Sequence, residues 1–203
     1  MDYKKFAISF IFAIALAFLF PNRKVEIKPA EICIDLCVFP MNTYTSLHYF
    51  RPKNSNEQFA VSYIRRYYKL AQLETPISKQ PASVKLAQGL LETNKGRSFL
   101  SLTGNNHFGI KCFANNCMTG HCINREDDTK YDRFRLYPNV EQSYRQHSFL
   151  LSNKNYRICL DSKTAFDWCD CLQLRGYATS KSYAKQLKKF ITKYNLLEFD
   201  GNI

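Results

Sequence analysis

The apolar positions of the chain follow a helical repeat from about residue 56 onward. Apolar side chains recur there every three or four positions, the spacing that places them on one face of an α-helix. The segment 74–76 predicts the end of the first helix, because the proline in it has no N–H to continue the backbone hydrogen bonds. The apolar face of that helix is expected to carry Phe59, Tyr63, Tyr67 and Leu70.

A second helix is predicted between Pro81 and Gly96. Proline suits the first turn of a helix, where no N–H is needed, and glycine is a frequent helix stop. The apolar face of this helix is expected to carry Val84, Ala87, Leu90 and Leu91.

The helical repeat is lost between residues 104 and 137. Glycine, asparagine and cysteine dominate the first part of this stretch. Toward its end, Phe134 and Leu136 alternate with Arg133 and Arg135. Because a period of two is typical of a strand, residues 123–136 are predicted to form a short β-hairpin.

Helical spacing returns after Pro138. Asn139 with Gln142 three positions later resembles a capping box and predicts a helix start. Two further helices are expected, over residues 162–174 with a stop at Gly176, and from about residue 180 onward. The buried faces of the three helices are expected to carry Tyr144, His147 and Leu151; Ala165, Trp168, Cys169 and Leu172; and Tyr183, Leu187, Phe190, Ile191 and Tyr194. The predicted fold class is therefore mainly α, with one small irregular lobe between helices.

The N-terminal residues differ in composition from the rest. Residues 1–20 place a short basic start before an apolar run, Phe6 to Phe20, that contains no charge. That run is shorter than the roughly 20 residues of a membrane-spanning helix, so residues 1–20 are expected to be a secretory signal peptide, with an uncleaved signal anchor as the alternative. Both alternatives predict export and limit membrane contact to this segment. The proline-containing residues 21–55 are expected to form a linker or arm, and residues 56–200 the folded domain.

The composition permits a packed core and restricts the class of partner. Apolar residues make up 45% of the 203 residues, and aromatic residues 15%. The formal net charge of +12 is compatible with nucleic acid, anionic lipid or an acidic cell-wall polymer. Nucleic acid is not expected, because no nucleic-acid-binding motif occurs and the predicted export opposes it.

The 8 cysteines agree with export, since an even set in an oxidising compartment indicates disulfides. No two CxxC motifs occur, and His107 and His121 have irregular spacing, so no metal or cofactor is expected. Spacing does not determine which cysteines pair, and a free buried cysteine is an alternative. Cys112 is a poor nucleophile candidate because it lies near two other cysteines.

Glu92 is the first candidate for chemistry. It follows Leu90 and Leu91 at the end of the second predicted helix, and Gln88 shares its helix face. Apolar surroundings raise the pKa of a carboxyl group, which would keep it protonated and able to donate to a leaving oxygen. The alternative is an ordinary solvated glutamate.

A second acidic position is expected in the lobe. Glu126, Asp127 and the aspartate that follows repel one another, so one of them could activate water or bind a cation. The alternative is a turn, which aspartate also favours. Two carboxyl groups on separate elements are what cleavage of a glycosidic bond usually requires.

Several other side chains are candidates for contact with a sugar. Asn105 and Asn106 can hydrogen-bond an N-acetyl group, or serve only as loop residues. Tyr177 can reach the same cleft from the start of the last helix, or be a packing tyrosine. His107 fits either a site or a core, whereas His147, on the apolar face of its helix, is expected to be a hydrogen-bonded core histidine.

Three blocks of this sequence resemble glycoside hydrolase family 73, the bacterial endo-β-N-acetylglucosaminidases that hydrolyse peptidoglycan. The blocks are residues 81–92, which end in Gln88-Gly89-Leu90-Leu91-Glu92, residues 96–98, and Asn105-Asn106-His107-Phe108-Gly109-Ile110-Lys111. Further similar positions follow in order: Phe134-Arg135 with Tyr137, Ser143 with His147, and Gly176-Tyr177-Ala178-Thr179 with Tyr183-Ala184. The resemblance covers about residues 58–200.

The resemblance implies a lysozyme-like helical fold with a small β-hairpin lobe. It implies hydrolysis of the β-1,4 bond on the reducing side of N-acetylglucosamine, with Glu92 as general acid and Tyr177 in the cleft. The second acid is expected at Glu126 or Asp127, where the lobe departs from the family pattern. The substrate-binding residues are expected to be Gln88, Asn105, Asn106, His107 and Phe108, and the partner peptidoglycan glycan strands.

Two alternatives to this enzyme remain. The domain can bind wall glycan without cutting it, although a pure binder has no need of Glu92. It can also cut another wall bond, either on the muramic-acid side or at a peptide amide. Amide cleavage normally requires zinc or a cysteine–histidine pair, for which the sequence offers no convincing candidate.

Overall fold

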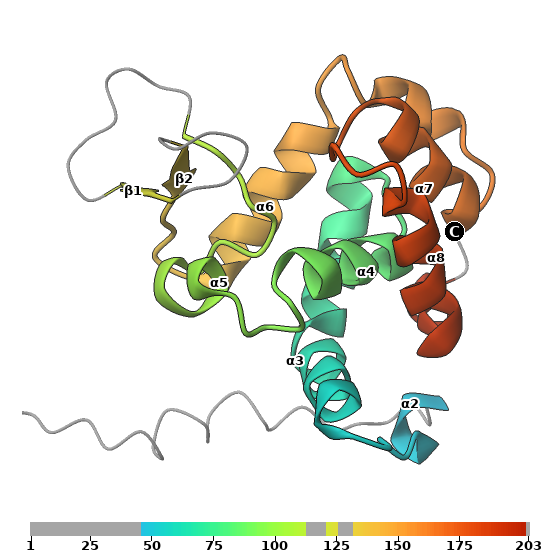
Figure 1. Ribbon diagram of the computed structural model, residues 1–203. Helices are drawn as coiled ribbons and strands as arrows, with labels where there is room; N and C mark the ends of the chain where they lie inside the picture. The colour runs from blue at the N-terminus through green and yellow to red at the C-terminus, as the bar shows by residue number, and fades with distance from the viewer. Residues whose placement is uncertain (1–45, 113–120, 126–131, 202–203) are drawn as a thin grey trace, which may run out of the picture. The chain divides into compact units, whose positions relative to one another are not determined.

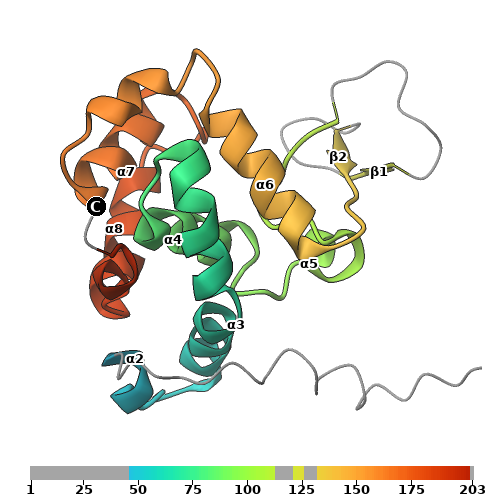
Figure 2. The same ribbon diagram turned by 180° about the vertical axis from the view of Figure 1, so that it is seen from behind.

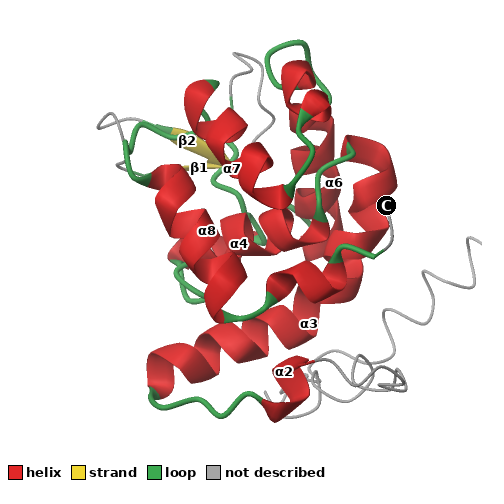
Figure 3. Ribbon diagram, turned by 90° about the vertical axis from the view of Figure 1, so that its right-hand side faces the viewer, coloured by secondary structure: helices red, strands yellow, loops and turns green. Residues whose placement is uncertain are grey.

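The computed structural model describes residues 46–112, 121–125 and 132–201 of the chain, which belong to one compact unit within residues 44–203 (Figure 1). These residues are mostly helical, with a single small hairpin (Figure 3). The elements in chain order are α2 Ser46–Tyr49, α3 Ser55–Ser78, α4 Ala82–Glu92, α5 Phe99–Gly104, β1 Cys122–Asn124, β2 Arg133–Arg135, α6 Val140–Leu151, η1 Arg157–Asp161, α7 Ala165–Leu174, α8 Tyr183–Lys193 and η2 Leu196–Phe199.

Helix α4 forms the centre of the unit. It packs against α3 on one side and against α7, α8 and η2 on the other (Figures 1 and 2). Every residue from Ala82 to Leu90 is buried, so the helix is covered on all sides rather than along the single apolar face predicted from the sequence. A helix that is buried on all sides must let its neighbours pack closely. Gly89 has no Cβ and therefore lets the Tyr63 side chain of α3 approach the helix backbone.

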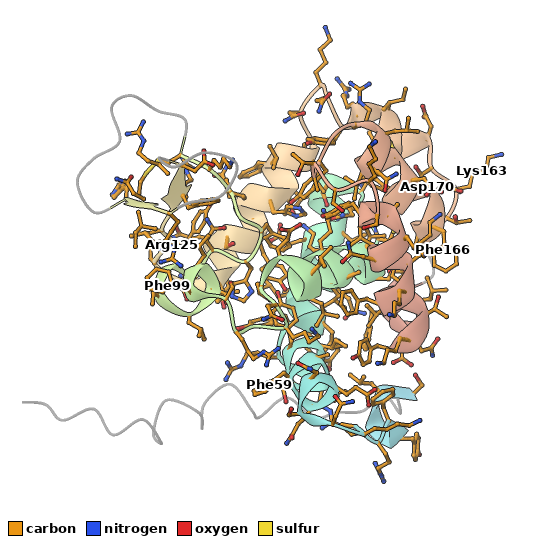
Figure 4. All side chains as sticks on the ribbon, in the orientation of Figure 1. Phe59, Phe99, Arg125, Lys163, Phe166 and Asp170 are labelled. Carbon is orange, nitrogen blue, oxygen red and sulfur yellow. A yellow bond between two sulfur atoms is a disulfide. The ribbon has the colours of Figure 1, made fainter. Side chains whose placement is uncertain are left out.

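Helix α3 is longer than the sequence predicted. It continues through Pro76 to Ser78, and Lys79 in the left-handed conformation ends it, so the predicted stop at 74–76 was wrong. Pro76 lies in the last turn and removes only one backbone donor, and Lys79 N–H bonds back to Thr75 at 2.7 Å. The predicted apolar face was also wrong at Phe59, which is 42% exposed and lies beneath the guanidinium of Arg97 (Figure 4).

The predicted hairpin is present. Strands β1 and β2 pair antiparallel, with Ile123 opposite the buried Phe134. A two-stranded hairpin is marginal alone. Here it is tied to the chain before it by the Cys112–Cys122 disulfide, and to α5 by Arg125, which stacks over Phe99 at 4.4 Å (Figure 4).

The three predicted C-terminal helices are confirmed, with later starts for the last two. Asn139 caps α6 by accepting a hydrogen bond from the Gln142 N–H at 3.0 Å. Helix α7 begins behind Thr164, which forms a reciprocal capping box with Asp167. Gly176 follows α7 with φ of 68°, a backbone conformation that favours glycine.

Two disulfides lie within the described residues. They join Cys112 to Cys122 and Cys159 to Cys171. Among the cysteines of the described segments, Cys169 is free, and its burial raises the pKa of the thiol to about 12. It is therefore unreactive in the folded state.

Part of the predicted linker is folded. Residues 46–49 form α2, and Leu47 is buried against the domain. The Ser46 N–H donates to the Glu198 carboxylate at 2.7 Å, and the rings of Phe50 and Tyr194 lie 5.3 Å apart. Residues 46–49 therefore pack with the folded unit, although the predicted boundary lies at residue 56. None of the helices in the described part of the chain has the length and apolar character to cross a membrane.

Candidate active site

Glu92 lies where the buried helix α4 reaches the surface, and its side chain is half-buried. The chain turns away directly after it. Thr93 caps the helix, donates from its hydroxyl to the Gly89 carbonyl and accepts from the Gly96 N–H at 2.7 Å. This tight turn, which includes Gly96 at φ of 81°, fixes the position of the last helical residue and hence of the Glu92 carboxylate.

A chain of buried hydrogen bonds ends on Glu92. The Gln80 amide donates to Gln88 Oε1, and Gln88 Nε2 donates to the Tyr183 hydroxyl at 3.0 Å. The Tyr183 hydroxyl donates to Glu92 Oε1 at 3.0 Å. Gln80 and Gln88 are fully buried and Tyr183 is 2% exposed. Gln88, expected to contact substrate, therefore lies beneath the carboxylate, with both ends of its amide bonded to protein.

Tyr177 is brought next to the same carboxylate. It follows α7, and its ring stacks on Tyr183 with 5.5 Å between centroids. Its hydroxyl is buried and has no hydrogen-bond partner among the described residues. Burial first, and then the charge of Glu92, raises the pKa of Tyr177 well above its usual value. Tyr177 therefore keeps its proton and can donate a hydrogen bond.

The two asparagines of the loop after α5 are bonded to backbone. Asn105 takes the left-handed conformation that ends α5, and its amide donates to the Tyr137 carbonyl at 2.9 Å. Asn106 is 2% exposed, and its amide donates to the carbonyls of Ile110 and Arg135. The same side chain accepts from the Ile110 N–H at 3.0 Å, so it fastens strand β2 to the loop.

His107 and Phe108 lie in the core beneath the lobe. His107 is 2% exposed and shares a 2.9 Å hydrogen bond with the Tyr63 hydroxyl. Burial, followed by the charge of Arg66, lowers the pKa of His107 to about 4, so the ring is neutral. Phe108 stacks on His147 with 3.9 Å between centroids. The structure thus places these predicted binding residues as supports of the loop, while their contact with substrate stays a prediction.

The sequence prediction was wrong about the hydrogen bond of one buried side chain, His147, and missed another, Lys85. His147 is buried as predicted, but the expected hydrogen bond was wrong: neither ring nitrogen has a partner among the described residues. Lys85 of α4 is fully buried and donates to the Ser148 hydroxyl at 2.6 Å. The signal in the sequence was a lysine inside a helix whose other positions are mostly apolar or small.

The second predicted acid lies outside the described residues, since Glu126 and Asp127 belong to the connection between β1 and β2. Asp132, at the end of that connection, forms an ion pair with Lys111 at 3.1 Å. The described segments contain no cluster of three or more histidine, cysteine or acidic side chains that could hold a metal ion.

Comparison with known proteins assigns the domain to a family. The sequence profile of the family described as mannosyl-glycoprotein endo-β-N-acetylglucosaminidase matches residues 68–196. The chain belongs to this glucosaminidase family. The match runs from the middle of α3 to the start of η2, so it includes both Glu92 and Tyr177.

Individual relatives and a solved structure support the assignment. The chain is 30% identical to the exo-glucosaminidase LytG of Bacillus subtilis over 58% of this chain and 45% of that protein. It is 33% identical to a probable N-acetylmuramidase of Lactococcus lactis over 59% of this chain and 30% of that protein. The catalytic domain of the autolysin Auto of Listeria monocytogenes superimposes with a TM-score of 0.59 at 27% identity, over 76% of this chain and 93% of that one.

These comparisons establish the fold of the domain but cover only part of each curated relative. The glucosaminidase domain has the lysozyme-like helical fold with a hairpin lobe that the sequence predicted. The chain spans less than half the length of the curated relatives described above.

Proposed function

We propose that this glucosaminidase domain hydrolyses the β-1,4 bond between N-acetylglucosamine and N-acetylmuramic acid in peptidoglycan, with Glu92 as the general acid. The placement of Glu92 supports this most directly. Its carboxylate is half-buried at the end of a fully buried helix, is oriented by Tyr183 and lies beside Tyr177. A general acid needs this combination of a fixed position, partial shielding and access to substrate.

The chemical step is a displacement at the anomeric carbon. Glu92 gives its proton to the glycosidic oxygen as the bond to the leaving sugar breaks and an oxocarbenium-like centre develops. In one version, Glu126 or Asp127 takes a proton from the attacking water, and the anomeric configuration inverts. In the other, the N-acetyl group of the substrate attacks first and water then opens the intermediate, with retention. Tyr177 completes the proposed site beside Glu92, with a protonated hydroxyl that has no hydrogen-bond partner among the described residues.

Replacement of Glu92 tests the proposal. Glu92→Gln keeps the size and the acceptor oxygen but removes the acidic proton. We expect a loss of about 10²–10⁴-fold in the release of fragments from purified peptidoglycan, with an unchanged circular dichroism spectrum and melting temperature. The control is Glu141→Gln, the same change at an exposed glutamate in the first turn of α6, which should keep full activity. Near wild-type turnover by Glu92→Gln would remove Glu92 from this role.

The bond that is cut has a second candidate, because a curated relative from Lactococcus lactis bears the name N-acetylmuramidase. Reduction of the digested wall with borohydride, followed by mass spectrometry, distinguishes the two. A reduced N-acetylglucosamine end supports the proposed bond, and a reduced N-acetylmuramic acid end supports the alternative. Binding without any new reducing end would indicate a wall-binding module instead.

We also propose that the protein acts in the cell envelope or outside the cell. The basic and apolar N-terminal segment supports export, and the two disulfides of the described residues fit an oxidising compartment. The glycan strands of the wall are then its partner. Fractionation of cells that produce the full chain, with detection of residues 1–20 by mass spectrometry, would test both export and cleavage.

A further inference from the structure

In the series of buried hydrogen bonds that leads to Glu92, the Tyr183 hydroxyl can donate its proton to only one group. An ionised carboxylate can accept a hydrogen bond but cannot donate one. When Glu92 is ionised, the single proton of Tyr183 must therefore point at Glu92 Oε1, which lies 3.0 Å away.

The other members of the chain follow from that direction. With its proton used, the Tyr183 oxygen must accept, and the group beside it at 3.0 Å is the amide of Gln88. The NH₂ end of Gln88 therefore faces Tyr183 and its oxygen faces the amide of Gln80. All three supporting side chains are buried, so water does not compete for these bonds. The direction of these bonds is therefore set from the ionised carboxylate, through Tyr183 and Gln88, to Gln80.

We infer that Tyr183, held as a donor by Gln88, is a positioning residue that keeps Glu92 Oε1 an acceptor and places the acidic proton on Oε2. This inference rests on the proposed role of Glu92. The glycosidic oxygen then receives its proton from one defined oxygen of the carboxyl group. The same hydrogen bond stabilises the ionised carboxylate that remains after the proton has left.

Tyr177 cannot replace Tyr183 in this role. The rings of the two tyrosines stack face to face 5.5 Å apart, but only the Tyr183 hydroxyl bonds both to Glu92 and to the Gln88 amide. Burial, first among the causes, raises the pKa of Tyr183 well above its usual value, so the hydroxyl stays a donor across the working pH range.

Tyr183→Phe is the decisive variant. It removes the donor to Glu92 and keeps the ring that packs on Tyr177. We expect the plateau kcat on peptidoglycan to fall about tenfold to a hundredfold with little change in KM. The alkaline limb of the pH–rate profile, which reports loss of the proton from the acid, should move to higher pH by about one unit, because the ionised carboxylate has lost a hydrogen bond.

Two comparisons separate positioning from loss of structure. Tyr194→Phe makes the same change at the buried residue that caps the other end of α8, and should leave kcat and the pH profile unchanged. Gln88→Met should shift the alkaline limb in the same direction as Tyr183→Phe, but should add nothing in the Tyr183→Phe background. A variant that loses activity only in proportion to its unfolded fraction, with an unmoved limb, would overturn the inference.

A measurement without substrate keeps this inference apart from the proposed function. With ¹³C-labelled glutamate carboxyl groups, NMR follows the titration of Glu92, assigned by its absence in Glu92→Gln. We expect Tyr183→Phe to raise the Glu92 midpoint even if the protein cuts no glycan. An unchanged midpoint in an enzyme that still requires Glu92 would remove Tyr183 from its role and leave the proposed function intact.

Discussion

At the scale of single residues, two buried charged side chains of this domain differ in their hydrogen-bond partners. Glu74 is 2% exposed and accepts two hydrogen bonds from Arg145, at 2.9 and 3.1 Å. Lys85 is fully buried and has the Ser148 hydroxyl, a neutral acceptor, at 2.6 Å. A buried ammonium without a bonded anion is costly, and the protein lowers that cost by giving up the proton.

Lys85 is therefore expected to make stability depend on pH. Burial, opposed by Glu74 and assisted by Arg145, lowers the pKa of Lys85 from 10.5 to about 7 in the folded state. Between pH 7 and 10.5 the unfolded chain binds a proton that the folded chain does not, so the free energy of unfolding rises with pH across this window. Below pH 7 both states are charged, and the folded state bears the full cost of the buried charge.

Lys85→Met tests this prediction. The variant keeps the length and apolar stem of the side chain but has no proton to lose. We expect urea unfolding at pH 6.5 to 9 to show a slope of stability against pH that is lower than wild type by up to about 1.4 kcal/mol per pH unit. Lys185→Met, at an exposed position on α8, should leave the slope unchanged. Equal slopes for wild type and Lys85→Met would mean that Lys85 remains charged in the fold.

At the scale of elements, one side-chain amide adds to the backbone hydrogen bonds that join the loop after α5 to strand β2. Asn106 bonds to the N–H and carbonyl of Ile110 and to the carbonyl of Arg135. The two segments also pair through their backbones, since Lys111 lies opposite Phe134 in an antiparallel bridge and the Arg135 N–H donates to the Ile110 carbonyl at 2.9 Å, so the side chain reinforces this short pairing. Asn106 is also one of the two asparagines that the sequence predicted to hydrogen-bond a sugar N-acetyl group.

Asn106→Ala distinguishes support of the fold from contact with substrate. Removal of the amide leaves the Ile110 N–H and the Arg135 carbonyl without this partner, while the Ile110 carbonyl keeps the Arg135 N–H. We therefore expect a loss of about 1–3 kcal/mol in unfolding free energy and faster hydrogen exchange at the Ile110 amide. Asn124→Ala, at an exposed position in β1, should change neither. If Asn106→Ala instead raises KM at unchanged stability and exchange, the asparagine binds substrate.

The sequence predicted elements better than it predicted partners. Apolar spacing located α4, α6 and α8, because burial on a helix face leaves a period that can be counted. It misplaced the end of α3, since a proline in the last turn removes only one backbone donor and need not end the helix. It assigned Gln88 to substrate because spacing shows only that Gln88 and Glu92 share a face, whereas Tyr183, which lies between them, comes from a helix 91 residues away in sequence.

At the scale of the whole folded unit, two groups of helices meet on α4. Helix α3, which packs against α6, lies on one side of α4, and α7, α8 and η2 lie on the other (Figure 2). Glu92 at the end of α4 takes its hydrogen bond from α8, while Tyr63 of α3 bonds to both His107 and Tyr144 at the base of the lobe. The placement of Glu92 relative to the base of the lobe therefore depends on the distance between α3 and α4.

Gly89 sets that distance, and adding a methyl group to it should disturb both stability and catalysis. A Cβ at position 89 would lie 2.3 Å from the Tyr63 hydroxyl oxygen, closer than two such atoms can approach. In Gly89→Ala the helices must separate or Tyr63 must leave its hydrogen bonds to His107 and Tyr144. We expect a loss of about 1–3 kcal/mol in unfolding free energy, net of the higher helix propensity of alanine, and a lower kcat at temperatures where the variant is folded.

The reciprocal variant Tyr63→Phe removes the clashing oxygen, and the remaining ring carbons would lie 3.0 and 3.1 Å from the new methyl, a contact that a small shift relieves. In a double-mutant cycle, Tyr63→Phe should therefore cost less in the Gly89→Ala background than in wild type. Strict additivity of the two changes would mean that Tyr63 does not set the spacing of α3 and α4.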